Sequence, residues 1–192
     1  MNGPPVGAGK SSFDLIRLDR LLSALSLNEG QTVLDVGCGN GNYTLAIAQV
    51  IGNNGSIFAI DMWEDGIGEL MSRANANGMN NIHASVGDAS RGIPVEDEYI
   101  DTCLMATVLH DLVQENADEG TLKEIWRVLK HDGRLVIIEF KKVEGPPGPP
   151  LGIRISPEEL EYLLQPYGFH IDQLVEIGEF IYLSSFVKQS ET

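Results

Sequence analysis

Three glycines at alternate positions, Gly37, Gly39 and Gly41, follow a short apolar run that contains one carboxylate, Asp35. Glycine lets the backbone take a positive φ and lets a ligand approach without meeting a Cβ atom. A helical pattern begins at Tyr43, and the N-terminus of a helix presents free N–H groups. The stretch therefore predicts a strand, a bare turn and a helix that together bind a nucleotide-like ligand.

The charge of Asp35 separates two classes of ligand. A loop for the pyrophosphate of a dinucleotide follows the pattern G-x-G-x-x-G, and Asn42 stands where its third glycine belongs. A carboxylate two residues before the first glycine repels a pyrophosphate and attracts an ammonium group. The pattern favours a ligand with an adenosine end and a cationic amino-acid end.

Further polar residues follow the next apolar runs. Asp61 ends the run 56–61, 20 residues after Gly41, where a carboxylate can accept hydrogen bonds from ribose hydroxyls. Met62 follows it, either over an adenine ring or packed at the start of a helix. His110 follows the fourth apolar run and is the candidate catalytic residue, as a general base or a substrate-orienting group, and a structural role stays open.

Apolar runs alternate with helical patterns and predict an α/β fold. The expected strands are 32–36, 56–61, 82–86, 99–106 and 134–140, and the expected helices are 12–26, 43–51, 66–77, 119–129 and 157–165. A hairpin of 171–177 and 180–187 follows. We expect a Rossmann-like, doubly wound sheet of about seven strands, mostly parallel, with a C-terminal antiparallel hairpin.

We expect one domain over residues 1–192. It consists of an N-terminal arm and helix (1–27), a cofactor-binding core (28–144), and a proline loop, helix and hairpin (145–192). Residues 4–11 end like a phosphate-binding loop, but Pro4 stands where that motif needs glycine. This segment is a flexible arm, or a lid that brings Lys10 near the substrate. The proline loop is a surface linker, a wall of the substrate pocket or a recognition peptide.

Composition excludes several classes of protein. The 192 residues are 43% hydrophobic and carry a formal net charge of −15, which opposes nucleic acids and anionic membranes. No apolar run is long enough to span a bilayer, and no signal-peptide pattern is present. Two cysteines give neither a disulfide framework nor a metal site. We expect a cytoplasmic protein without membrane insertion, and the oligomeric state leaves no mark on the sequence.

The run Val33-Leu34-Asp35-Val36-Gly37-Cys38-Gly39-Asn40-Gly41 resembles the first motif of the class I S-adenosylmethionine-dependent methyltransferases. The similarity is strongest to the type 11, or ubiquinone/menaquinone-biosynthesis-like, branch. It covers residues 30–140, where 127–135 also resemble the family segment RVLKPGG-L, with His131-Asp132 in place of Pro-Gly.

The resemblance implies S-adenosylmethionine as the cofactor and in-line methyl transfer to a small molecule, because no cap domain is inserted. Expected cofactor-binding residues are Asp35, Gly37, Cys38, Gly39, Asp61, Met62, Asp88, Ala89 and Thr107, with Asp88 on the adenine amine. Expected substrate-binding residues are Tyr43, His110 and Glu139, the last of which pairs alternatively with Lys141. Two other functions stay open: a non-catalytic binding or protein-interaction module, and, less favoured, an NAD-dependent oxidoreductase.

Overall fold

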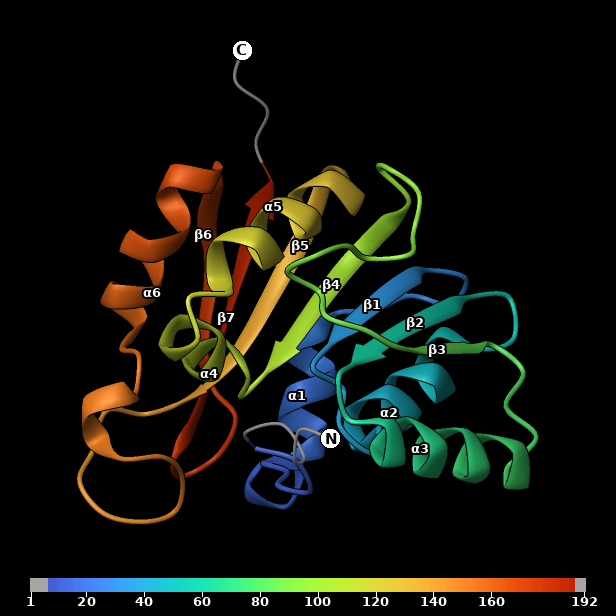
Figure 1. Ribbon diagram of the computed structural model, residues 1–192, viewed down its shortest axis with the longest axis horizontal. Coiled ribbons are helices and arrows are strands. Elements are labelled where there is room, and N and C mark those ends of the chain that lie inside the picture. Colours follow the sequence, from blue (N-terminus) through green and yellow to red (C-terminus); the bar gives the residue numbers. More distant parts are fainter. Residues whose placement is uncertain (1–6, 189–192) are drawn as a thin grey trace.

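A seven-stranded sheet organises the molecule in the computed structural model, which describes residues 7–188 (Figure 1). The strands are β1 (Thr32–Val36), β2 (Ser56–Asp61), β3 (Ile82–Val86), β4 (Ile100–Ala106), β5 (Leu129–Phe140), β6 (Phe169–Glu176) and β7 (Ile181–Lys188). Their order is β3-β2-β1-β4-β5-β7-β6. Strands β1 to β5 pair in parallel, whereas β7 is antiparallel to β5 and β6. The predicted fold class is confirmed.

Helices cover both faces of this sheet (Figure 1). They are α1 (Leu18–Leu25), α2 (Asn42–Ile51), α3 (Glu64–Ala76), α4 (Leu109–Gln114), α5 (Asp118–Val128) and α6 (Pro157–Leu164). Neighbouring strand residues point to opposite faces, so Val33 joins the core under α1, α2 and α3, and Leu34 joins the core under α4, α5 and α6. Burial on both faces explains the nearly continuous apolar runs of the inner strands.

The segment before β1 differs from the predicted helix 12–26. A 3₁₀ turn, Phe13–Leu15, precedes the shorter helix α1. Ser12 stands at the N-cap position of this turn, but its side chain makes no cap hydrogen bond. Its hydroxyl instead bonds the Tyr43 hydroxyl (2.9 Å) and Thr107 Oγ1 (3.1 Å). At α6, by contrast, Ser156 and Glu159 form a capping box, with Pro157 in the first turn.

Strand β5 begins earlier than predicted. The expected turn at 130–133 lies inside the strand as an irregularity, with Asp132 at φ 61°. Ile100 of β4 pairs with Leu129, and Thr102 already pairs with Arg134. The extra residues of β5 therefore bulge out of the ladder before regular pairing begins.

One guanidinium holds the proline loop after β5 in place. Arg154 is 3% exposed and donates to five backbone carbonyls. The acceptors are the oxygens of Lys141, Val143, Gly145, Pro147 and Pro149. One buried side chain thus binds carbonyls spread over the whole segment.

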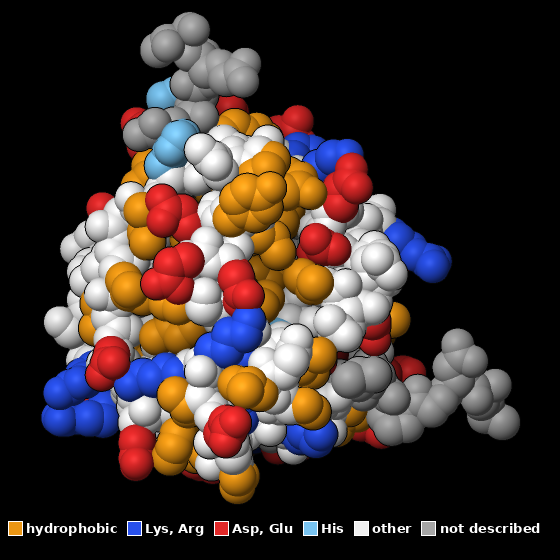
Figure 2. All heavy atoms as spheres, turned by 90° about the vertical axis from the view of Figure 1, so that its left-hand side faces the viewer, with side chains coloured by type: hydrophobic (Ala, Val, Ile, Leu, Met, Phe, Trp, Pro, Cys, Tyr) orange, Lys and Arg blue, Asp and Glu red, His pale blue; other side chains and the backbone are white. Residues whose placement is uncertain are grey.

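The surface beside α6 carries apolar and charged side chains together (Figure 2). Tyr162 of α6 is 80% exposed, and Leu174 of the edge strand β6 is 51% exposed. Among residues 7–188, no helix has the length and apolar character needed to cross a bilayer.

Candidate functional site

A cavity of about 130 Å³ lies at the carboxyl ends of four neighbouring strands. Seven of the nine expected cofactor-binding residues line it: Gly37, Gly39, Asp61, Met62, Asp88, Ala89 and Thr107. They belong to the segments at the ends of β1, β2, β3 and β4. Because the sheet order places these strands side by side, residues up to 70 positions apart meet around one space.

The backbone of the glycine bend is bound to β2. The amides of Gly37 and Cys38 donate to the Ile60 carbonyl, at 2.8 and 3.3 Å. The amide of Gly39 donates to Asp61 Oδ2 at 2.8 Å. Three consecutive N–H groups are therefore used inside the protein and do not form a free row for the oxygens of a pyrophosphate.

Gly37 is required by its neighbours as well as by its backbone. It has φ +70°, and a Cβ atom there would lie 2.6 Å from Val108 Cγ2. A side chain at this position would be strained and would push Val108, which also lines the cavity, out of place.

The Asp61 carboxylate lies between the bend and the cavity. Its Oδ1 accepts from the Trp63 amide at 2.8 Å, while Oδ2 takes the Gly39 bond. Each carboxylate oxygen has two acceptor positions, so two backbone bonds leave room for hydroxyl donors from a ligand. The same bonds fix the orientation of the carboxylate.

Asp88 closes a turn after β3. Its Oδ1 accepts from the Ser90 amide (3.0 Å) and hydroxyl (2.6 Å), and its Oδ2 lies 3.1 Å from Arg91 Nε. Asp88 does not cap a helix, because residues 87–99 contain none. The carboxylate therefore shapes a loop at the cavity wall.

Asp35 lies beneath the bend and does not line the cavity. It is 1% exposed, and Thr44 of α2 donates to its Oδ2 at 2.6 Å. Its Oδ1 has no partner. Burial raises the pKa of Asp35 to about 7, against the Thr44 hydrogen bond and with the nearby charge of Asp61. Asp35 is a buried carboxyl poised between its two charge states at neutral pH.

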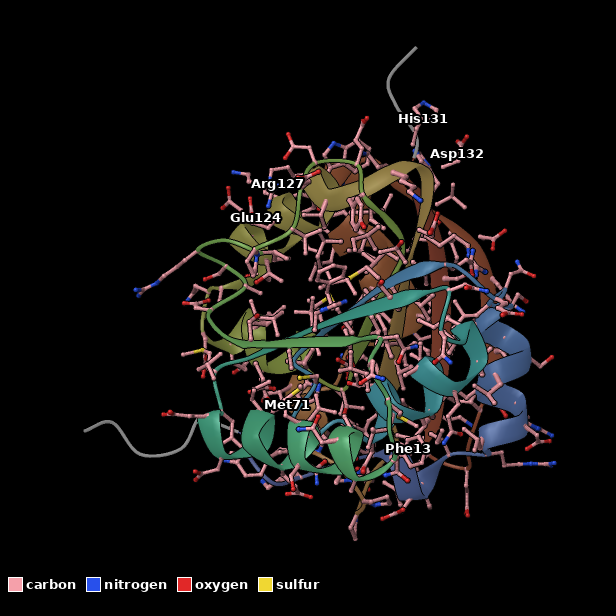
Figure 3. All side chains as sticks on the ribbon, turned by 90° about the vertical axis from the view of Figure 1, so that its right-hand side faces the viewer. Phe13, Met71, Glu124, Arg127, His131 and Asp132 are labelled. Carbon is pink, nitrogen blue, oxygen red and sulfur yellow. The ribbon has the colours of Figure 1, made fainter. Side chains whose placement is uncertain are left out.

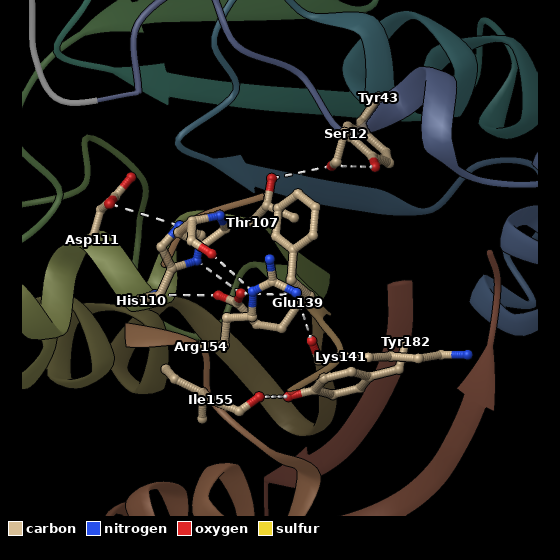
Figure 4. A network of polar contacts seen from close by, with 12 residues as sticks. Ser12, Tyr43, Thr107, His110, Asp111, Glu139, Lys141, Arg154, Ile155 and Tyr182 are labelled. Carbon is tan, nitrogen blue, oxygen red and sulfur yellow. Dashed lines mark hydrogen bonds and ion pairs between the residues drawn. The ribbon is translucent and has the colours of Figure 1, made fainter. Parts of the chain in front are cut away.

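Cys38 and Tyr43 also lie off the cavity wall. Burial raises the pKa of the Cys38 thiol, which disfavours the reactive thiolate. The Tyr43 ring packs edge-on to Phe13 at 5.0 Å, and its hydroxyl bonds Ser12. Ser12 in turn bonds Thr107, a β-branched cavity residue at φ 54°. These hydroxyls tie the N-terminal segment to a strained backbone position at the end of β4 (Figure 4).

The N-terminal segment is part of the cavity wall. Gly7, Ala8, Gly9 and Lys10 all line the space, in a turn closed by a 2.9 Å bond from the Lys10 amide to the Gly7 carbonyl. This placement supports the lid alternative over the flexible arm. We call residues 7–10 the N-terminal strap.

Helix α4 and its two cap residues supply part of the cavity wall, of which sequence reasoning missed Asp111, Leu112 and Glu115. Val108, Asp111, Leu112 and Glu115 line the cavity. Their spacing of three and four residues is that of one helical face, and this spacing is the signal that could have identified them. The helices expected from the sequence did not include this short one.

His110 and Glu139 were expected to face the substrate, yet neither lines the cavity. His110 Nδ1 lies 2.8 Å from Glu139 Oε2, with the two side chains 6% and 0% exposed. The alternative partner of Glu139 is also excluded, because Lys141 pairs with Glu176 at 3.0 Å. Burial lowers the pKa of His110, but the hydrogen bond and charge of Glu139, with the charge of Asp111, outweigh it and raise the pKa.

A family profile described as a methyltransferase domain matches residues 27–164. The chain belongs to this methyltransferase family. It is a class I S-adenosylmethionine-dependent methyltransferase, and the family and fold imply S-adenosylmethionine as the methyl donor.

Individual relatives of this methyltransferase agree. The ubiquinone/menaquinone biosynthesis C-methyltransferase of Vibrio parahaemolyticus is 28% identical over 153 residues, which are 79% of this chain and 52% of the relative. This methyltransferase therefore spans about half the length of the quinone-pathway relatives it matches.

Solved structures share the fold over nearly the whole chain. A methyltransferase from Aquifex aeolicus matches with a TM-score of 0.84 at 30% identity, covering 93% of each chain. A Sulfolobus solfataricus protein assigned to the type 11 methyltransferases matches with a TM-score of 0.76 at 21% identity, covering 92% of this chain and 95% of that one. The second likeness speaks for the fold alone.

Proposed function

We propose that this methyltransferase binds S-adenosylmethionine in the cavity at the ends of β1 to β4 and transfers its methyl group to a small-molecule acceptor. The observation that carries the proposal is the bend after β1. The amides of this bend donate hydrogen bonds to the Ile60 carbonyl and the Asp61 carboxylate, and further carboxylates line the cavity. Such a wall suits a cationic adenosyl ligand and opposes a doubly anionic dinucleotide.

The four strand ends suggest a role for each wall residue. Asp61 accepts hydrogen bonds from the ribose hydroxyls, and Asp88 accepts one from the adenine amine. Met62 and Ala89 lie beside the adenine ring. Gly37 and Gly39 let the methionine part lie close to the backbone. Thr107 lies at the end of β4, where the reacting end of the ligand is expected.

Asp35 contributes through the electrostatic attraction between its carboxylate and a cationic group of the ligand. It lies under the bend, and a ligand cation above the bend favours its ionised form. Because the pKa of Asp35 is raised to about 7, ligand binding near neutral pH should release part of a proton. Cys38 supports the bend through its backbone, and Tyr43 holds the N-terminal segment through Ser12.

The donor supplies a methyl group already activated by the positive charge on sulfur, so the protein has to align the acceptor and exclude water. The N-terminal strap and α4 form the wall on the side of β4 and suit this task. The quinone-pathway relatives make a ring carbon beside a hydroxyl the first acceptor to test.

Two measurements test the proposal in order. Isothermal titration calorimetry compares S-adenosylhomocysteine with NADH, and we expect heat from the first alone. Release of S-adenosylhomocysteine is then measured over a metabolite set that includes reduced naphthoquinones. An isotherm with NADH alone would support the oxidoreductase. Binding of S-adenosylhomocysteine without turnover of any acceptor would support the non-catalytic module.

A further inference from the structure

Asp111 is the carboxylate that α4 presents to the cavity. Its side chain is 22% exposed, and its Oδ2 would lie 3.1 Å from a Cβ atom placed on Gly7 of the strap. The residue therefore stands where α4 and the strap meet over the cavity. No cofactor role proposed above uses it.

A buried ion pair stands directly behind Asp111 (Figure 4). Glu139 at the end of β5 accepts from the His110 backbone amide at 3.2 Å through Oε1. Its Oε2 faces His110 Nδ1 at 2.8 Å. The other ring nitrogen, Nε2, lies 3.7 Å from Asp111 Oδ1. The chain Glu139–His110–Asp111 thus runs from the core to the cavity wall.

The order of the strands indicates which part of the ligand pair meets Asp111. The residues proposed for adenine, ribose and the methionine part follow β3, β2 and β1, in that spatial order. A ligand laid along these strands brings its reacting end to β4. Helix α4 follows β4 in the chain and walls the far side, which is the acceptor's side.

We propose that Asp111 is an acceptor-binding residue, that His110 and Glu139 position it, and that the acceptor carries a hydroxyl or protonated amino group and no anionic group. This inference rests on the proposed function. Asp111 accepts a hydrogen bond from the donor group of the acceptor and so orients the atom that receives the methyl group. His110 and Glu139 act through Asp111 and do not touch the acceptor.

The charges around the cavity agree with a neutral or cationic acceptor. Among the described residues that line it, the acidic ones are Asp61, Asp88, Asp111 and Glu115, and the basic one is Lys10. Arg91 pairs with Asp88 from outside the wall. A carboxylate on the acceptor would meet the charge of Asp111 in a wall where four acidic side chains face one basic side chain.

The groups that face His110 hold its ring firmly. Glu139 and Asp111 favour the protonated ring, Arg154 opposes it, and the Phe140 ring packs edge-on at 6.4 Å. The ring nitrogen Nε2 faces Asp111 Oδ1 at 3.7 Å, so a fixed ring orients the Asp111 carboxylate toward the cavity. The pair therefore has a use at the cavity although neither member lines it.

The test uses three matched probes, benzylamine, benzyl alcohol and benzoate, titrated into the full chain saturated with S-adenosylhomocysteine and followed by NMR line shifts. We expect the amine and the alcohol to bind and benzoate not to bind. Asp111→Asn should weaken the amine at least about tenfold, as loss of a charged hydrogen-bond partner does. Asp132→Asn is the matched control. Phe13 lies in the N-terminal segment at the cavity end of the sheet, and Asp132 lies at the opposite end of the sheet, away from the cavity (Figure 3).

Two further variants test the positioning residues. His110→Asn keeps a donor for Glu139 and removes Nε2, and it should reduce the preference for benzylamine over benzoate while leaving S-adenosylhomocysteine affinity within about twofold. In Glu139→Gln, the His110 ring followed by nitrogen-15 NMR should titrate at lower pH. A merely structural pair would leave the probe preference unchanged in His110→Asn.

The outcomes separate the inference from the proposed function. Failure of wild-type protein to bind S-adenosylhomocysteine would reject the proposed function itself. If that ligand binds, the inference is overturned by benzoate binding as well as benzylamine, by no probe binding at all, or by an unchanged probe order in Asp111→Asn.

Discussion

The Gly39 amide donates to Asp61 Oδ2 at 2.8 Å and so joins the bend after β1 to the end of β2. This bond makes Asp61 both a ligand-facing carboxylate and a brace for the bend. The two roles can be separated by substitution, since an amide keeps one acceptor oxygen and a methyl group keeps none.

We therefore expect Asp61→Asn to lose about tenfold in S-adenosylhomocysteine affinity and Asp61→Ala to lose more, because the charged acceptor of two backbone bonds disappears. Calorimetry measures the affinity, and urea unfolding should show a loss of about 1–3 kcal/mol for the alanine variant. Equal affinity of Asp61→Ala and wild type would contradict the ribose role.

Gly41 and Gly68 form a matched pair for backbone tests. A Cβ atom on Gly41, at φ +81°, would lie 2.2 Å from Leu70 Cδ1, whereas one on Gly68 in α3 meets nothing within 4 Å. Gly41→Ala should destabilise by more than about 2 kcal/mol, because Leu70 is fully buried and cannot yield easily. Gly68→Ala should stabilise by about 0.4–1 kcal/mol. Chemical unfolding of both variants checks the contrast, which a similar change in the two would refute.

Asp35 should give the stability a dependence on pH. Its pKa is raised from 3.8 to about 7 in the folded state. The folded protein therefore holds a proton that the unfolded chain releases, and stability falls as pH rises from about 4 through 7. Three pKa units correspond to roughly 4 kcal/mol above pH 7.

Asp35→Asn should remove this slope and be the more stable protein at pH 8, provided that the amide keeps the Thr44 bond. Urea unfolding at pH 5 and pH 8 gives the two free energies of unfolding. If the free energy of unfolding of the wild type decreases from pH 5 to pH 8 no more than that of Asp35→Asn does, Asp35 is already ionised in the folded protein.

Arg154 should control the order of the proline loop. The three guanidinium nitrogens of Arg154 donate hydrogen bonds to five carbonyl oxygens. A lysine side chain has a single nitrogen and cannot reach all five. We expect Arg154→Lys to destabilise by about 2–3 kcal/mol and to make residues 141–150 more sensitive to limited proteolysis. Arg91→Lys is the control, because the Arg91 side chain is 86% exposed. Cleavage of the loop at equal rates in both variants would argue against Arg154 as its anchor.

The sequence predicted the sheet well because the inner strands β1, β2 and β4 are apolar runs that a glycine or a polar residue closes, as at Gly37, Asp61 and Thr107. It misplaced Asp35 because residues on a strand alternate between faces. Asp35 shares the face of Val33 and so lies under α2, away from the cavity edge.

His110 was misplaced for a different reason. Helix α4 has six residues and starts after Val108 without a side-chain cap, so it leaves little local signal. The pairing of His110 with Glu139 spans 29 positions and depends on the neighbouring ends of β4 and β5. Contacts of this kind follow from the tertiary fold and are not written in local spacing.

The N-terminal strap has a practical consequence for protein production. Residues 7–10 form part of the cavity wall, so an affinity tag fused ahead of Met1 would be attached only a few positions from residues that line the cavity. Strand β7 begins at Ile181, which pairs with Phe140 at the carboxyl end of β5. It ends at Lys188, which pairs with Phe169 at the opposite end of the sheet from the cavity. Purification handles are therefore better placed after β7, where they leave the opening of the binding space clear.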